Sequence, residues 1–173
     1  MILVDANLLI YAHDAGSPHH VPSRAWLDRQ LTGPLRVGLP WLSLLAFLRI
    51  VSNRRAYSRA VSIERAWSQV ESWLDAPPAW IPQPTEHHPA ILGALLAEGS
   101  CEGNLVPDAH LAALAIEHGL TLCSADRGFA RFSELRLENP LAHPGTVKSP
   151  GRKYRRSIPE KFPKPLRGSV TAS

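Results

Sequence analysis

Cysteine, lysine and long apolar runs are scarce in this sequence of 173 residues, and each scarcity excludes a class of protein. The only cysteines, Cys101 and Cys123, form no CxxC pair, which excludes a disulfide scaffold and a cysteine zinc site. No stretch reaches the roughly 18 uninterrupted apolar residues of a membrane-spanning helix, and the longest candidate, 42–51, contains Arg49. The N-terminus has neither the basic region nor the cleavage site of a signal peptide. We therefore expect a soluble, cytoplasmic protein without membrane association.

Lysine is absent from residues 1–147, where eleven arginines and fourteen acids give a formal charge of −3. Residues 148–173 hold eight basic residues and one acid, Glu160, which gives +7. Five prolines between positions 144 and 165 accompany this change. We expect a folded domain over 1–142 and a basic, proline-rich tail over 143–173 that adds little to the core. The tail is either an arm for RNA or another polyanion, or a flexible extension, and the second is favoured because charge runs are usually solvated.

The rest of the sequence alternates short apolar strands with helices. Strands are expected at 2–4, 80–81, 120–123 and 135–137. A helical turn is expected at 8–11, and helices at about 19–31, 41–52, 62–75, 86–97 and 105–118. This alternation predicts an α/β layer fold with a parallel sheet. Ser62 is expected to cap the helix that follows it, and Gly119 to end the apolar helix before it.

Three aspartates stand where such a sheet would bring them together. Asp5 follows the first strand, Asp126 follows the strand at 120–123, and Asp108 lies in the first turns of a buried helix. Ligands of open α/β sheets bind at the carboxyl ends of the strands, so we expect these side chains to converge. Each also has an ordinary explanation, since Asp5 could accept loop amides, Asp108 could complement the helix dipole and Asp126 could cap a turn. Jointly they require a cation, and carboxylate oxygens suit Mg²⁺ or Mn²⁺.

Three short motifs surround these aspartates. They read Val4-Asp-Ala-Asn7, Asn104-Leu-Val-Pro-Asp108 and Cys123-Ser-Ala-Asp-Arg-Gly-Phe129. In order and spacing they resemble the motifs of PIN-domain proteins, and in particular the VapC toxins of type II toxin–antitoxin systems. The resemblance spans residues 1 to about 142. It implies a three-layer fold in which a parallel sheet of about five strands is flanked by helices.

The same resemblance implies an activity and partners. It implies a Mg²⁺-dependent endoribonuclease in which Asp5 and Asp108, with Asp126 directly or through water, hold the metal that activates a water for attack on RNA. It also implies a VapB-like antitoxin that inserts a peptide across the acidic site, and a homodimer formed through apolar helices.

Two departures from the family pattern concern the acids. The family usually supplies a glutamate at the position that Ala46 occupies, and Gly128 stands where the last motif often has a second aspartate. Both leave the coordination number open. They also leave open an alternative function, a PIN-fold module of weak or no activity that binds RNA or protein. Loss of RNA cleavage on addition of EDTA distinguishes the nuclease from the binding module.

A third hypothesis treats Asp5 as a phosphoacceptor, as in haloacid dehalogenase-type phosphatases or response regulators. We disfavour it because Asn7 stands where the first class needs an acid, and residues 1–147 lack the lysine that the second class needs.

Other side chains are ambiguous. Asn7 either orients the Asp5 carboxylate or caps the turn after it, and Ser124 either assists at the metal or bonds to the backbone. Cys123 is expected as a buried apolar residue. RNA affinity is expected from the tail or from Arg54, Arg55 and Arg59. Scattered surface positions are expected for His13, His19, His20, His87 and His88. Apolar contacts, in the core or with partners, are expected of Trp67, Trp73 and Trp80.

Overall fold

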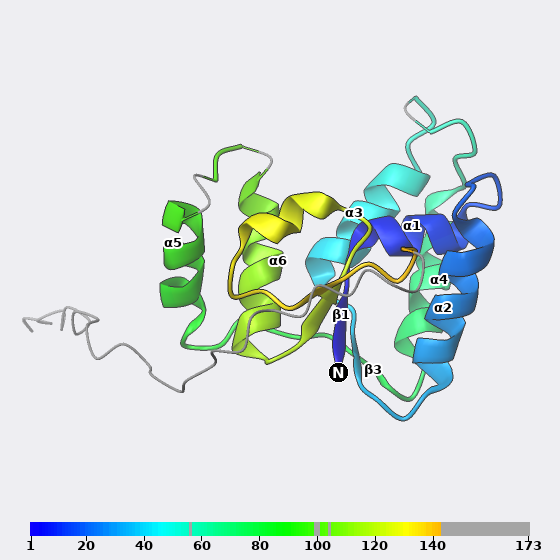
Figure 1. Ribbon diagram of the computed structural model, residues 1–173. Helices are drawn as coiled ribbons and strands as arrows, with labels where there is room; N and C mark the ends of the chain where they lie inside the picture. The colour runs from blue at the N-terminus through cyan, green and yellow to red at the C-terminus, as the bar shows by residue number, and fades with distance from the viewer. Residues whose placement is uncertain (56, 99–100, 104, 143–173) are drawn as a thin grey trace, which may run out of the picture.

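The computed structural model describes residues 1–55, 57–98, 101–103 and 105–142. The tail predicted over 143–173 lies outside the described residues. Five short strands form one sheet in which every neighbouring pair is parallel (Figure 1). In sheet order the strands are β3 (Ala79–Trp80), β2 (Val37–Gly38), β1 (Ile2–Val4), β4 (Thr121–Cys123) and β5 (Leu137–Glu138). The predicted α/β fold with a five-stranded parallel sheet is confirmed.

Helices connect the strands, and the six α-helices of the described residues begin and end within two residues of the predicted positions. They are α1 (Ala6–His13), α2 (His20–Thr32), α3 (Trp41–Val51), α4 (Ile63–Leu74), α5 (His88–Glu98) and α6 (Leu105–Glu117). Ser62 caps α4 as predicted, because its hydroxyl accepts a hydrogen bond from the Arg65 backbone N–H at 3.3 Å. Gly119 follows α6 with a φ of 64°, the left-handed conformation that commonly ends a helix.

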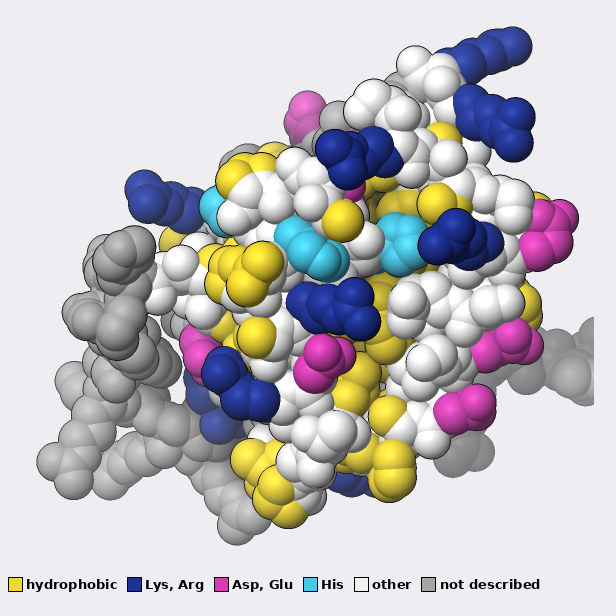
Figure 2. Space-filling model, turned by 90° about the vertical axis from the view of Figure 1, so that its right-hand side faces the viewer, with side chains coloured by type: hydrophobic (Ala, Val, Ile, Leu, Met, Phe, Trp, Pro, Cys, Tyr) yellow, Lys and Arg dark blue, Asp and Glu magenta, His cyan; other side chains and the backbone are white. Residues whose placement is uncertain are grey.

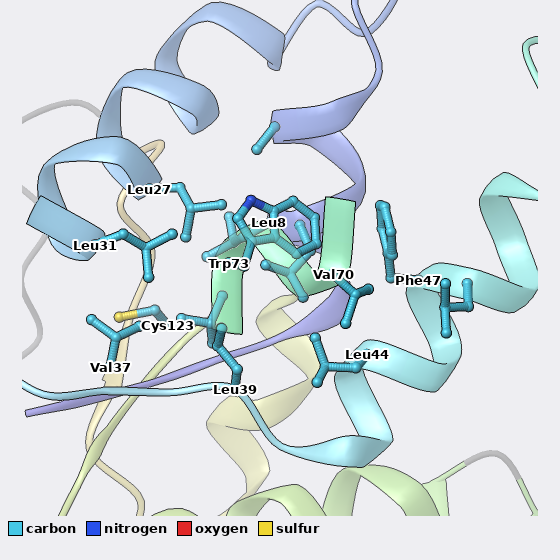
Figure 3. Packing of buried hydrophobic residues seen from close by; sticks show 14 of the residues in the cluster. Leu8, Leu27, Leu31, Val37, Leu39, Leu44, Phe47, Val70, Trp73 and Cys123 are labelled. Atoms are coloured by element: carbon cyan, nitrogen blue, oxygen red, sulfur yellow. The ribbon is translucent and has the colours of Figure 1, made fainter. Parts of the chain in front are cut away.

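The sheet separates two apolar layers, because successive side chains of a strand point to opposite faces. Val4 and Cys123 pack with α1 to α4 on one face, whereas Leu3 and Leu122 pack with α5 and α6 on the other. In Figure 1, α1, α2 and α4 lie to the right of β1, and α5 and α6 lie to the left. Figure 3 shows the first layer, whose buried side chains include Leu8, Leu27, Leu44, Phe47, Val70 and Trp73.

The strand order reverses at β1. From β1 the chain continues to β2 and β3 on one side, and it later places β4 and β5 on the other. The carboxyl ends of the strands at such a reversal form the usual ligand crevice of an open α/β sheet. Val4 of β1 is in register with Cys123 of β4, so the loops beginning at Asp5 and Ser124 leave the sheet side by side. The fold therefore brings the first and third motifs together.

Two elements were not predicted. Strand β2 contains only Val37 and Gly38, too short a run to show a period in the sequence. A 3₁₀ helix, η1 (Arg127–Arg131), follows Asp126. Strand β5 begins at Leu137, two residues later than the strand expected there. Within the part of the chain that the structure describes, no helix is long and apolar enough to cross a membrane.

One prediction about the histidines is wrong. His88 was expected at the surface but is only 7% exposed, because both of its ring nitrogens are hydrogen-bonded inside the fold. Among the tryptophans, Trp73 belongs to the core and Trp67 is exposed, while Trp80 is half-buried. Cys123 is buried as predicted, and burial raises the pKa of its thiol far above the ordinary value.

Candidate active site

Asp5 lies at the end of β1, directly before α1, and is held by one side chain from α1 and one from the loop after β4. Its Oδ2 accepts a hydrogen bond from Ser124 Oγ at 2.6 Å and another from Asn7 Nδ2 at 2.7 Å. The Asp5 backbone N–H donates to the carbonyl of Cys123 at 3.1 Å. The carboxylate of Asp5 is therefore fixed in orientation at the junction of β1 and β4. Besides the backbone amide of Ala6, two side chains therefore bond to this carboxylate, which the sequence did not indicate.

Ser124 is the centre of this hydrogen-bond network. Its hydroxyl is 1% exposed, and besides donating to Asp5 it accepts from Asn7 Nδ2 at 2.9 Å and from the Asp126 backbone N–H at 3.0 Å. Asn7 closes the network, because its Oδ1 accepts the backbone N–H of Ala125 at 3.3 Å. The network joins the first motif to the third. The expected bond of Ser124 to the backbone is confirmed by the Asp126 N–H, and the bonds to Asp5 and Asn7 add to it.

Asp108 lies in the first turn of α6 and is half-buried. Burial, followed by the negative charge of Asp126, raises the pKa of Asp108, and the nearby guanidinium of Arg131 partly opposes that rise. Burial also raises the pKa of Asp5, the Ser124 hydrogen bond opposes it, and the charges of Asp108 and Asp126 raise it further. The three carboxyl groups are thus close enough to repel one another. Two of them hold a negative charge less readily than they would in water.

Asp126 differs from the other two aspartates because it is exposed and has a local role. Its Oδ1 accepts the backbone N–H of Gly128 at 2.7 Å and caps η1, which is the ordinary explanation considered from the sequence. The departure at Gly128 matters here. A Cβ at this position would lie 3.0 Å from Asp126 Oδ1, so with a larger residue the carboxylate would have to shift slightly. The glycine therefore permits the cap.

The donor set of this site, which consists of carboxylate oxygens, fits a divalent metal ion. Among the described residues, no three His, Cys, Asp or Glu side chains surround a common metal position. The chemistry still favours a hard cation, because a positive charge beside Asp5 and Asp108 would offset the burial and the carboxylate repulsion that together raise both pKa values. Ala46, at the position of the expected glutamate, is half-buried on α3 and offers no ligand. Among the described residues, the carboxylates that act on one another here are those of Asp5, Asp108 and Asp126.

A second polar cluster lies away from these aspartates, between α5 and α6. His88 Nδ1 lies 2.7 Å from Glu117 Oε1, and His88 Nε2 lies 2.9 Å from His110 Nδ1. Thr85 donates its backbone N–H and its hydroxyl to Glu117 Oε2, at 3.1 and 2.6 Å. The sequence carried one signal for this cluster, because His110 and Glu117 are seven residues apart on one face of an otherwise apolar helix.

Comparison with known proteins gives matches over nearly all of the described residues. A family model described as "PIN domain" matches residues 2–135. Ribonuclease VapC37 of Mycobacterium tuberculosis is 45% identical over 142 residues, which are 82% of this chain and 99% of that protein. Ribonuclease VapC43 of the same organism is 42% identical over 141 residues, which are 82% of this chain and 96% of that protein.

Solved structures have the same fold at lower identity. VapBC2 from Rickettsia felis, solved bound to a DNA fragment from its promoter, gives a TM-score of 0.61 at 22% identity, over 80% of this chain and 98% of that chain. FitAcB from Neisseria gonorrhoeae gives a TM-score of 0.59 at 21% identity, over 81% of this chain and 98% of that chain.

Proposed function

This chain belongs to the PIN-domain family and, within it, to the VapC ribonucleases, and from this membership we propose that it is a Mg²⁺-dependent endoribonuclease and the toxin of a toxin–antitoxin pair. Ribonucleases of this family are generally metal-dependent. We assign the metal to Asp5 and Asp108, with Asp126 as a direct ligand or as a partner through water. The nuclease domain is assigned to residues 1–142.

One observation carries the assignment. Asp5 and Asp108 come from β1 and α6, and the pKa of each is raised by burial and by neighbouring carboxylates. When a fold keeps carboxyl groups this close together with no cation among them, the ionised form of those carboxyl groups is disfavoured. The sole basic side chain found to act on this pair, within the described residues, is Arg131 beside Asp108. A bound divalent ion accounts for the presence of the cluster.

The residues of the network have roles in positioning. Ser124 and Asn7 direct their donors to Oδ2 of Asp5, which holds the carboxylate still and favours its ionised form. The Asp126 side chain is exposed and can turn toward the other acids if it gives up the hydrogen bond that it accepts from the Gly128 backbone N–H. When bound, Mg²⁺ supplies a water of lowered pKa and positive charge for the phosphodiester transition state. No histidine or thiol nucleophile is needed.

The partners follow from the named relatives. VapBC2 and FitAcB show the fold of this chain, and VapC37 and VapC43 are named ribonucleases. We propose that the chain cleaves RNA in the cytoplasm, forms a homodimer, and is inhibited by a VapB-like antitoxin. A small antitoxin gene immediately upstream of this reading frame supports that proposal, and its absence from the locus argues against it.

Cleavage of bacterial total RNA by the purified full chain tests the activity. We expect cleavage with Mg²⁺, none with EDTA, and none with Asp108→Asn. Asp75→Asn is the matched control, because Asp75 is exposed at the end of α4, away from the cluster, and its substitution should leave cleavage unchanged. Cleavage that persists in EDTA, or in Asp108→Asn at wild-type rate, would contradict the metal assignment.

A further inference from the structure

A hollow of about 480 Å³ lies between α1, α2 and α4 and is distinct from the aspartate cluster. It is lined by Ala12, His13, Ala15, His20, Arg24, Leu27, Asp28, Arg65, Ser68, Gln69, Ser72 and Trp73. Figure 2 shows the face of the molecule on which α2 and α4 lie, where two histidines gather with Lys or Arg side chains near the middle of the face. The metal mechanism proposed above uses none of these side chains.

The hollow concentrates positive charge in an acidic domain. Arg24 of α2 and Arg65 of α4 line it, and Asp28 is the one acid among its described lining residues. Asp28 lies 3.8 Å from Arg24, and both side chains are 66% exposed, so their ion pair is weak. Burial lowers the pKa of His13, and the charge of Arg65 is the next largest cause. Arg65 therefore lies close enough to His13 for its charge to act on that ring at the hollow.

The uncharged groups of the hollow add hydrogen-bond donors. His20 Nδ1 lies 3.2 Å from the carbonyl of Tyr11, and since a carbonyl only accepts, Nδ1 carries the hydrogen. In that tautomer Nε2 is an acceptor, so the uncharged ring of His20 offers no donor to phosphate. From α4, Ser68, Gln69 and Ser72 add two hydroxyls and an amide. Guanidinium groups combined with hydroxyl and amide donors are the set that recognises phosphate.

The apolar lining residues argue against a peptide as the ligand. Leu27 is 1% exposed, and Ala12 and Trp73 are each 6% exposed. Their surfaces are already covered by the protein, which leaves a peptide side chain little apolar area to bury. A phosphate needs no such area, because its affinity comes from charge and hydrogen bonds.

Helix α1 links the hollow to the aspartates. It starts directly after Asp5 and ends at His13, which lines the hollow. The eight steps from Asp5 to His13 correspond to about 12 Å along the helix axis. That separation is short enough for one RNA strand to contact both sites, since single-strand binding domains cover about 4–16 nucleotides.

We propose that this hollow binds a backbone phosphate of the RNA strand whose cleavage is assigned to the aspartates, a few nucleotides from the cut. The proposal rests on the ribonuclease function proposed above. It adds Arg24 and Arg65 as the principal phosphate contacts, with the donors of Ser68, Gln69 and Ser72 around them. It predicts that substitutions here weaken RNA binding without removing the chemistry.

Binding of a fluorescein-labelled single-stranded RNA of about 12 nucleotides, measured by anisotropy in EDTA at several KCl concentrations, tests the proposal separately from cleavage. Loss of one phosphate contact in Arg24→Gln/Arg65→Gln should reduce the slope of log K against log salt by about 0.7. Ser68→Glu, which places a carboxylate at an exposed position of the hollow, should reduce the slope similarly without disturbing the core. Arg29→Gln, on the exposed surface of α2 outside the hollow, is the control and should keep the wild-type slope.

Equal slopes for the wild type and both hollow variants would overturn the proposal, as would an equal reduction in Arg29→Gln. The proposal would also be overturned if AMP at constant ionic strength displaced the RNA from the wild type but not from the hollow variants. That result would assign the hollow to a free nucleotide. Loss of antitoxin binding in the double variant at an unchanged RNA slope would assign the hollow to a protein partner. If the hollow variants reduce the salt slope but the wild-type chain does not cleave RNA, the proposal of phosphate binding in the hollow stands and the nuclease function is rejected.

Discussion

Removal of the Ser124 hydroxyl tests how the site is held together. Ser124→Ala removes the donor to Asp5 Oδ2 and leaves the Asn7 amide and the Asp126 backbone N–H without the acceptor that they have in the wild type. Alanine is smaller and fits the same space. Any loss of stability therefore comes from hydrogen bonds rather than from packing strain.

The expected loss of stability is about 3 kcal/mol at neutral pH. A hydrogen bond to an ionised carboxylate contributes about 1.5–3 kcal/mol, and a buried donor left without a partner adds about 1–3 kcal/mol. For a domain of this size, about 3 kcal/mol lowers Tm by about 9 °C. The Ser124 bond opposes the burial that raises the pKa of Asp5, so the variant should have a still higher pKa at this carboxyl. The acid limb of the activity profile should then move to higher pH.

Thermal unfolding followed by circular dichroism measures this loss, with Ser43→Ala as the matched control. Ser43 is also 1% exposed, but its Oγ has no hydrogen-bond partner among the described residues. Removing that hydroxyl should leave Tm unchanged or slightly higher. The difference between the wild type and Ser124→Ala should shrink as pH falls through the pKa of Asp5, because a protonated carboxyl is a weaker acceptor. Equal Tm changes in the two serine variants would refute the reasoning.

Four further predictions follow. Without divalent ions, Asp108→Asn should raise Tm at neutral pH. The reason is that the pKa of Asp108 is raised in the folded protein, so ionisation of this carboxyl as pH rises lowers the stability of the fold. A lower Tm would show instead that the ionised Asp108 carboxylate stabilises the metal-free protein. Burial alone would raise the pKa of Glu117, but hydrogen bonds to its carboxylate lower it below 4.5, so Glu117→Gln should lower Tm at pH 7 and have little effect once pH falls below the lowered pKa. Ala46→Glu should tighten Mg²⁺ binding measured by calorimetry, whereas destabilisation that Mg²⁺ does not rescue would place this side chain in the core. Truncation after Pro144 should leave a folded enzyme that cleaves RNA with Mg²⁺, and an insoluble product would mean that the domain boundary is misplaced.

The elements that the sequence predicted best are those with a clear period or a strong end signal. The apolar repeat of α4 and its cap at Ser62 were both visible, as was the glycine that ends α6. An apolar run followed directly by Asp5, and another followed three residues later by Asp126, indicated strands that deliver carboxylates to one edge. The two-residue strand β2 could not be predicted in this way, because its existence depends on its neighbours β1 and β3 rather than on its own pattern.

The hydrogen-bond network of the site was not predictable, because it consists of contacts between residues far apart in the sequence. Ser124 and Asp5 are 119 positions apart, and no local pattern shows that a strand-end hydroxyl bonds to the first aspartate. The buried His88 was missed for the same reason, since its partners are on another helix. Local chemistry did anticipate the role of Asp126 as a cap, because Asp is a common residue before a turn.

Diffraction from crystals of the full chain grown with Mn²⁺, collected near the manganese absorption edge, tests the central claim most directly. The account predicts an anomalous peak about 2–2.5 Å from carboxylate oxygens of both Asp5 and Asp108, with Asp126 bound directly or through water. A peak at the His88–His110–Glu117 cluster, with none between Asp5 and Asp108, would contradict it.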